Sequence, residues 1–269
     1  QFLIENMAPE HRVYRYNYVK NNCATTPVVV IESAIGDSIA FNEVQETLSF
    51  ATFRDEMNYF HRHYPWYQFG IDLALGSGID YNLTPREKIF APVALCAMLD
   101  SATVAGAPIV TARNVLNDAP PAILAPTSWY LTPKAVFWLL FVLAFALQMR
   151  DLRRRAVSRW FDTMFFGLCG IVGSVIFFLV FFSAHEATSP NWLLVALNPL
   201  CFAGAVLPWV RGRRIKAIYF RLNFWAVLLL TIVWPFTDQH INGALLPLAL
   251  IDMMRSGYYS MLNRRIKWE

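Results

Sequence analysis

The chain has 269 residues, of which 56% are hydrophobic and 15% aromatic, and its formal net charge is +4. Soluble globular domains contain about 45–50% apolar residues, so this composition excludes an ordinary soluble protein. Residues 1–128 carry 8 Lys or Arg and 13 Asp or Glu, whereas residues 129–269 carry 15 and 6. Because the basic half is also the apolar half, its charge indicates a membrane and not a nucleic-acid partner.

Residues 1–128 predict a soluble portion with mixed secondary structure. Tyr side chains alternate with period two over Val13–Val19, which predicts a strand. The segment Pro27–Ile35 has Pro at its start and Gly36 just after its end, which favours a short helix, although its β-branched run leaves a strand open. Thr84-Pro-Arg-Glu87 has the pattern of a capping box and predicts a helix that runs to about Ser101. A Pro-rich linker over residues 117–128 leads to the apolar half.

Residues 129–269 predict an all-α transmembrane bundle of about five helices. A membrane-spanning helix needs about 20 consecutive apolar residues. The apolar runs that come closest to this length cover residues 129–149, 163–184, 192–210, 220–237 and 244–262.

Charged residues between these runs predict the orientation. Basic clusters lie at Arg150–Arg159, Arg211–Lys216 and Arg264–Lys267, whereas the alternate loops His185–Asn191 and Asp238–Gly243 contain no Lys or Arg. Basic loops stay in the cytoplasm. We therefore expect the C-terminus inside and residues 1–128 outside.

Cys23 is the residue in the soluble portion with the clearest potential for chemistry. It lies between the expected strand and the helix near Pro27, so it falls at or just before a helix N-terminus. Helix N-termini stabilise a thiolate and supply N–H groups that can hold an oxyanion. The alternatives are a buried structural thiol, and a disulfide with Cys96 in an oxidising compartment.

A nucleophilic Cys needs a base within hydrogen-bond reach, usually His. None of the five histidines has a decisive spacing, and each is more readily explained as a surface or interface residue than as the base. The i, i+2 spacing of His61 and His63 does not place them on one helix face, so no metal site is expected; no cofactor is expected either. The histidines are His11, His61, His63, His185 and His240.

Two further features have both functional and structural explanations. The aromatic, Gly-punctuated segment Tyr64–Gly76 fits a loop that touches the membrane or a lipid, and equally a core loop. Asp252 and Arg255 lie three residues apart in the last apolar run. Ionisable residues at that depth are functional candidates, but two residues at this spacing also pair along one helix face.

Several of these segments together resemble the Lnb family of bacterial lipoprotein N-acyltransferases. The resemblance rests on Tyr14–Asn17, Asn21–Thr25, Pro65-Trp66, Phe69–Leu73 with Leu75-Gly76, and Arg86-Glu87. The soluble part is also similar to the permuted papain-like group that includes lecithin:retinol acyltransferase. The resemblance implies an α+β papain-like (permuted) soluble portion followed by the transmembrane bundle.

The resemblance also implies a reaction and a site. Cys23 would take an acyl chain from a membrane phospholipid and pass it to the N-terminal Cys of a lipoprotein. We expect Asn22 and Asp72 to support the nucleophile, and substrate contacts from Tyr16, Trp66, Phe69 and Arg86. In this family the catalytic His lies on a strand upstream of the Cys. We therefore expect that the sequence, which starts at Gln1, begins inside a longer chain and that the soluble portion here is incomplete.

The expected function is phospholipid-dependent acyl transfer at the outer face of a bacterial inner membrane. One alternative is a membrane-anchored cysteine hydrolase or amidase, which needs the same thiol but no helix bundle. The other is a non-enzymatic subunit of a membrane complex, which the lack of an assigned base favours and which would have a protein partner.

Overall fold

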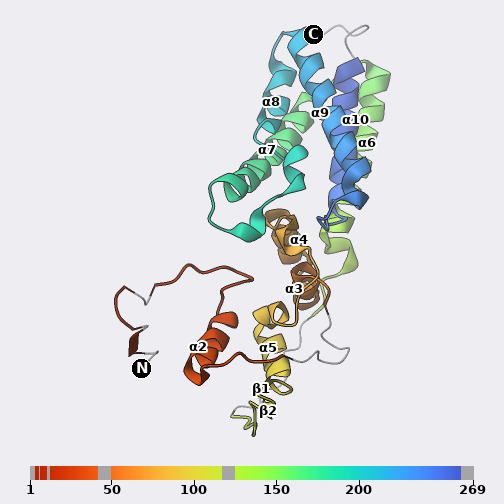
Figure 1. Cartoon of the computed structure of the whole chain (residues 1–269). Helices are drawn as coiled ribbons and strands as arrows, with labels where there is room; N and C mark the ends of the chain where they lie inside the picture. The colour runs from red at the N-terminus through yellow and green to blue at the C-terminus, as the bar shows by residue number, and fades with distance from the viewer. Residues whose placement is uncertain (1–3, 6, 11–12, 42–49, 117–124, 262–269) are drawn as a thin grey trace. The chain divides into compact units, whose positions relative to one another are not determined.

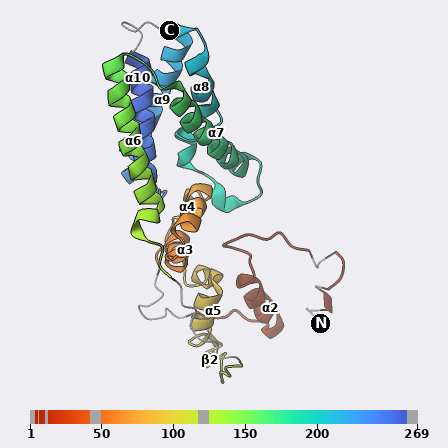
Figure 2. The same cartoon turned by 180° about the vertical axis from the view of Figure 1, so that it is seen from behind.

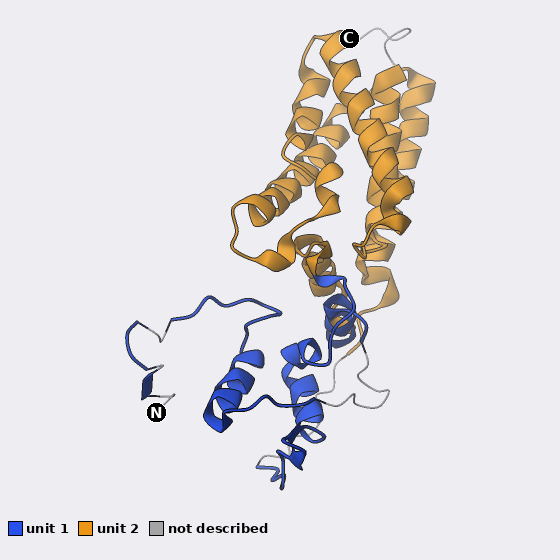
Figure 3. Cartoon of the chain, viewed as in Figure 1, with its two compact units in different colours: residues 1–60, 79–124 blue, residues 61–78, 125–269 orange. Residues whose placement is uncertain are grey.

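The computed structural model describes residues 4–5, 7–10, 13–41, 50–116 and 125–261. It divides into two compact units (Figure 3). Unit 1 comprises residues 1–60 and 79–124, and unit 2 comprises residues 61–78 and 125–269. Residues 61–78 are therefore grouped with the C-terminal part of the chain. That residues 1–128 are the outer portion and residues 129–269 the membrane portion stays a prediction.

Unit 1 is built from short helices around a small apolar core. Its core residues are Val28, Ile39, Ile89, Met98 and Ala102. Its elements are α2 (Thr25–Ile35), most of α3 (Phe53–His61), the 3-10 helix η2 (Glu87–Phe90), α5 (Pro92–Leu99), and the strands β1 (Thr103–Val104) and β2 (Ala107–Pro108).

The strand expected over Val13–Val19 is absent from the described residues. Residues 13–16 have no regular structure, and the nearest pairing is a single local bridge between Asn17 and Asn21. A period-two pattern makes a strand only where a neighbouring segment pairs with it, and no described segment does so. With β1 and β2 as the two described strands, a papain-like sheet is not observed in this part of the chain.

The two helices expected in unit 1 form with altered boundaries. α2 covers the predicted helix and ends at Gly36, whose φ of 78° is the left-handed conformation that Gly adopts easily. The capping box also forms, because the Glu87 carboxylate accepts from the Thr84 N–H at 2.9 Å. However, the helix after it is split: Ala91, which precedes Pro92, is extended with ψ 132°, so η2 ends and α5 begins anew.

Unit 2 is a helix bundle with one short helix, α4 (Pro65–Ala74), from the N-terminal half (Figures 1 and 2). Three of its helices are long and apolar enough to cross a membrane: α6 (Pro133–Arg154), α7 (Arg159–Phe181) and α9 (Arg213–Val233), which a 3-10 turn extends to Phe236. Its other helices are α8 (Cys201–Val206) and α10 (Leu245–Met261), with short 3-10 turns in the connections. The chain is therefore a multi-pass membrane protein.

The third expected span is not a continuous helix. Residues 192–210 form a 3-10 helix at Trp192–Val195, then α8, then a 3-10 turn at Leu207–Trp209. Pro199 and Pro208 interrupt this run, and a proline removes a backbone donor and clashes with the preceding turn. Apolar composition alone therefore overestimated the helix length here. The expected fifth span corresponds to α10 over the 17 residues that the structure describes.

The bundle packs most closely where small residues allow it. α7 lies against α8, α9 against α10, and α6 against α10. A Cβ placed on Gly173 of α7 would lie 2.3 Å from the backbone nitrogen of Asn198, so only glycine allows this approach. Large apolar side chains on the outer faces of the long helices remain exposed, as lipid-facing residues do, among them Leu139, Leu143, Leu168, Ile171, Phe178, Leu222 and Leu229.

Candidate active site

The turn before α2 is fixed by Asn22, which is 5% exposed. Its side-chain oxygen accepts hydrogen bonds from the N–H groups of Ala24, at 2.8 Å, and Thr25, at 3.0 Å. Its side-chain amide donates to the carbonyl oxygens of Tyr18, at 3.0 Å, and Phe90, at 2.8 Å. All four hydrogen-bonding positions of the amide are used. Asn22 therefore caps α2 and joins its start to η2, although the N-cap residue Ala24 has no capping side chain.

Cys23 lies between Asn22 and the start of α2, as a free and exposed thiol. The first helical residue is Thr25, so Cys23 directly precedes the N-cap. Within the described ranges, no acceptor lies within hydrogen-bonding distance of the Cys23 backbone N–H. The turn therefore presents a thiol and an adjacent backbone donor on the surface of unit 1.

Cys96 is also free and exposed, so the alternative of a Cys23–Cys96 disulfide is not observed. Cys96 lies inside α5, and its sulfur accepts from the Arg113 guanidinium at 2.8 Å. Unlike Cys23, it does not lie at the start of a helix.

Tyr16 lies in the irregular segment that leads to this turn. Its side chain is about half exposed. Partial burial raises its pKa, and the neighbouring Cys23 and Tyr14 raise it further, because a phenolate close to other anionic groups is disfavoured. Tyr16 is therefore near enough to Cys23 for the two groups to interact electrostatically.

Arg86 is held by Glu32 of α2. Its two terminal nitrogens donate to the two Glu32 carboxylate oxygens, at 2.6 and 2.5 Å. This ion pair lowers the pKa of Glu32. Arg86 remains half exposed, so its guanidinium still presents one side to solvent.

Asp72, Trp66 and Phe69 lie on α4 and belong to unit 2, whereas Asn22, Cys23, Tyr16 and Arg86 belong to unit 1. The segment Tyr64–Gly76 forms this helix and not the expected loop. Asp72 is buried and accepts from the Asn242 side chain at 2.7 Å. The Trp66 indole donates to the Leu131 carbonyl at 2.7 Å. Phe69 packs on Phe137 of α6, with ring centroids 5.2 Å apart.

His61 lies just before α4 and interacts with two residues of that helix, Tyr67 and Asp72. Its ring lies edge-on to Tyr67 at 4.7 Å. Burial lowers its pKa, and the nearby Asp72 carboxylate partly opposes this effect. Its buried Nδ1 has no hydrogen-bond partner among the described residues. His185 bonds Ser183 at 2.7 Å, and His11 lies outside the described residues. No histidine is thereby assigned as the base.

Two buried polar clusters among the described residues of α10 replace the local Asp252–Arg255 pair that the spacing suggested. Arg255 bonds two other carboxylates: Asp162, at 2.6 and 2.8 Å, and Asp151, at 3.1 Å. Asp252 instead accepts from Asn223, at 2.6 Å, and Ser256, at 2.8 Å. The spacing of three residues suggested a local pair, but partners from α6, α7 and α9 satisfy these groups.

A third polar group was not anticipated from the sequence. Buried Gln239 donates to the Asn191 side chain at 3.0 Å and accepts from the Trp192 N–H at 2.8 Å. Asn191 in turn donates to the Leu73 carbonyl at 2.9 Å. This network joins α4 to two loops of the bundle. Its one signal in the sequence was the absence of Lys and Arg from both loops.

A family model of the Lnb transmembrane domain matches residues 125–266, more than half of the chain. No curated protein and no solved structure matches the chain. The matched range contains α6 to α10 and therefore the whole bundle apart from α4. This chain belongs to the Lnb family.

Proposed function

We propose that the protein is an acyltransferase that moves an acyl chain from a membrane phospholipid to the N-terminal Cys of a lipoprotein, through a thioester on Cys23. The observation that carries the proposal is the exposed, free Cys23 on the turn fixed by Asn22, in a chain of the Lnb family. Both substrates are anchored in the membrane by acyl chains. They can therefore reach an enzyme that is embedded in the same bilayer without leaving it.

The reaction has two steps, acylation of Cys23 and transfer of the acyl chain to the amine. The Cys23 thiolate attacks the ester carbonyl of the phospholipid, a C–S bond forms, the C–O bond breaks, and lysophospholipid leaves with a proton. The lipoprotein amine then attacks the thioester, an amide forms, the C–S bond breaks, and the amine loses a proton as the thiolate returns. The backbone N–H of Cys23 is a suitable donor to the oxyanion in each step.

The proposal also covers the roles of further residues, the fold of the soluble portion and the orientation of the chain in the membrane. Asn22 supports the turn, Asp72 has a supporting role, and Tyr16, Trp66, Phe69 and Arg86 contact substrate. The soluble portion has the permuted papain-like arrangement, with the base on a strand upstream of Cys23. The protein lies in the bacterial inner membrane, with the C-terminus cytoplasmic and Cys23 outside, as the distribution of basic loops supports.

The test uses cells whose N-acylation enzyme is the full-length protein, with mass spectrometry of a reporter lipoprotein. We expect triacylated reporter from wild type, and a loss of several orders of magnitude from Cys23→Ala, as is usual for a covalent nucleophile. Cys96→Ala is the matched control, because Cys96 is also exposed and free but lies within a helix. A Cys23→Ser variant incubated with labelled phospholipid should also lack the hydroxylamine-sensitive acyl label of wild type.

Three results would contradict this proposal. Triacylated reporter from Cys23→Ala would exclude the covalent mechanism. A wild-type protein that is inserted in the membrane but yields no triacylated reporter would favour a non-enzymatic subunit, and release of a free fatty acid without transfer would favour a hydrolase.

A further inference from the structure

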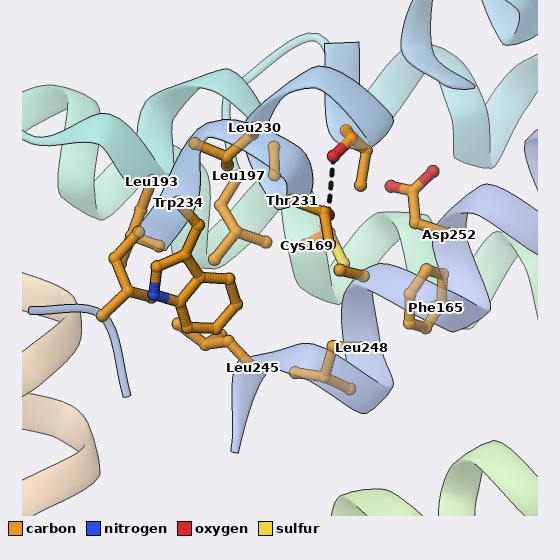
Figure 4. Close-up of a pocket in the computed structure, with 14 residues that line it drawn as sticks. Phe165, Cys169, Leu193, Leu197, Leu230, Thr231, Trp234, Leu245, Leu248 and Asp252 are labelled. Atoms are coloured by element: carbon orange, nitrogen blue, oxygen red, sulfur yellow. Dashed lines mark hydrogen bonds between the residues drawn. The ribbon is translucent and has the colours of Figure 1, made fainter. Parts of the chain in front are cut away.

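The helix bundle of unit 2 contains a partly open pocket, whose empty space together with the open solvent at its mouth is about 480 Å³. Helices α7, α9 and α10 contribute most of its wall, and loop residues complete it (Figure 4). The pocket contrasts with the contact between α7 and the turn before α8, where Gly173 meets the backbone of Asn198 directly.

The lining of the pocket offers almost no free hydrogen-bonding group. Its walls are nearly all apolar. The hydroxyl of Thr231 donates to the Val227 carbonyl at 2.7 Å, so this residue presents its methyl group (Figure 4). At Asp252, the Oδ1 atom accepts from Asn223 and Ser256, which leaves Oδ2 as a polar atom of the lining. A ligand with polar groups inside the pocket would leave them unpaired, at a considerable cost.

The residues that line the pocket extend along the helices. Figure 4 shows Trp234 at one end beside Leu193 and Leu245, with Phe165 and Asp252 at the other. From Leu245 to Asp252 α10 makes about two turns, or about 10 Å. The indole N–H of Trp234 has no acceptor in the part of the chain that the structure describes, as suits a side chain at a polar interface.

We propose that this pocket binds one fatty-acyl chain, with the chain extending from Trp234 towards Asp252. An acyl chain is long, narrow, apolar and abundant in a membrane, and it needs no hydrogen bonds. That the pocket holds an acyl chain of the donor or the acceptor rests on the proposed acyl transfer, whereas the binding of an acyl chain as such does not. Because lipid is as apolar as the pocket, shape and not hydrophobicity selects the chain.

The test is photo-crosslinking of the full chain in phospholipid nanodiscs that contain a trace of phospholipid with a diazirine near the end of one acyl chain. We expect crosslinks on pocket residues, such as Cys169 and Leu245, that saturate near one per protein, and unsaturable crosslinks on the lipid-facing Leu229. A second arm uses a diacylglyceryl-cysteine peptide with the same photoreactive chain, and the arm that saturates first identifies the source of the chain.

Two variants fill the pocket from different elements: Ala249→Phe from α10 and Ala196→Phe from the loop before α8. We expect each to reduce the pocket crosslinks at least fivefold and to leave those on Leu229 unchanged. Ala146→Phe, on the exposed face of α6, is the matched control and should change neither. Wild-type protein without pocket crosslinks, or pocket crosslinks that persist in the folded variants, would overturn the proposal.

This readout is separate from catalysis. Cys23→Ala should keep the pocket crosslinks, so the pocket and the nucleophile can fail independently. Saturable crosslinks without any acyl transfer would support the pocket and reject the proposed function. Transfer that depends on Cys23 but is accompanied by no pocket crosslinks would do the reverse.

Discussion

The side-chain amide of Asn22 donates a 2.8 Å hydrogen bond to the carbonyl of Phe90, 68 residues further along the chain. This bond joins the turn that carries Cys23 to the end of η2. The same side chain caps α2, so one residue both starts the helix and fixes the turn to the core of unit 1.

Asn22→Ala should therefore destabilise unit 1 by about 2 kcal/mol or more, because it removes a helix cap and leaves buried carbonyls unpaired. Thermal unfolding of the full chain in detergent measures the change. Asn21→Ala is the control, since the Asn21 side-chain amide bonds, among the described residues, only the exposed carbonyl of Arg15 and the Thr26 hydroxyl. Equal losses from both variants would show that the long-range bond to Phe90 contributes nothing.

Glu56 makes the stability of unit 1 depend on pH. It is 1% exposed, and neither carboxylate oxygen has a hydrogen-bond partner among the described residues. Burial raises its pKa to about 8, although Lys88 partly opposes the shift. Between the unfolded value near 4.5 and about pH 8, the folded state binds the extra proton. Folding stability is therefore lost as the pH rises through this window.

Glu56→Gln should remove this loss, because the amide is neutral at every pH in the window. We expect the variant to gain up to a few kcal/mol over wild type at pH 8 and little at pH 4.5. Unfolding at both pH values tests this, with Glu186→Gln, an exposed carboxyl, as the control. A gain of the same size at both pH values would contradict a buried titrating group.

Local signals in the sequence predicted what local interactions decide. Pro27 and Gly36 predicted α2, and the Thr84–Glu87 box predicted a helix start. The Tyr14–Tyr18 alternation failed as a strand signal, because strand formation requires a partner that the pattern does not specify. The Arg255 partners lie 93 and 104 residues away, so no spacing within α10 could identify them. The site residues Asn22 and Cys23 depended on their short-range context and on the family resemblance.

Gly173 should tolerate no side chain. A Cβ at this position would lie 2.3 Å from the Asn198 nitrogen, so α7 and residues 197–198 would have to separate. Gly173→Ala should cost about 1–3 kcal/mol or more, as overpacking does. Gly167→Ala on the same helix is the matched control, because its nearest neighbour is the Ala205 Cβ at 4.0 Å. Comparison of their unfolding temperatures in detergent measures the difference, and similar temperatures would mean that α7 and residues 197–198 separate easily.

Arg255 should be the most sensitive charged residue of the bundle. Arg255→Met removes the cation that is bonded to buried Asp162 and leaves Asp151 with Arg150 alone, and the loss of a buried partner typically costs about 3–5 kcal/mol. Arg255→Lys should lose less, since it keeps the charge but not the two-pronged contact with Asp162.

The decisive comparison is between two double variants. If Arg255 acts through Asp162, then adding Asp162→Asn to Arg255→Met removes an unpaired carboxylate and should recover part of the lost stability. Adding Asp252→Asn should recover none, because Asp252 is bonded to Asn223 and Ser256 instead. The opposite pattern in the unfolding temperatures would restore the local Asp252–Arg255 pair that the spacing in the sequence suggested. Asp162→Asn alone completes the cycle, which isolates the coupling energy of the two residues.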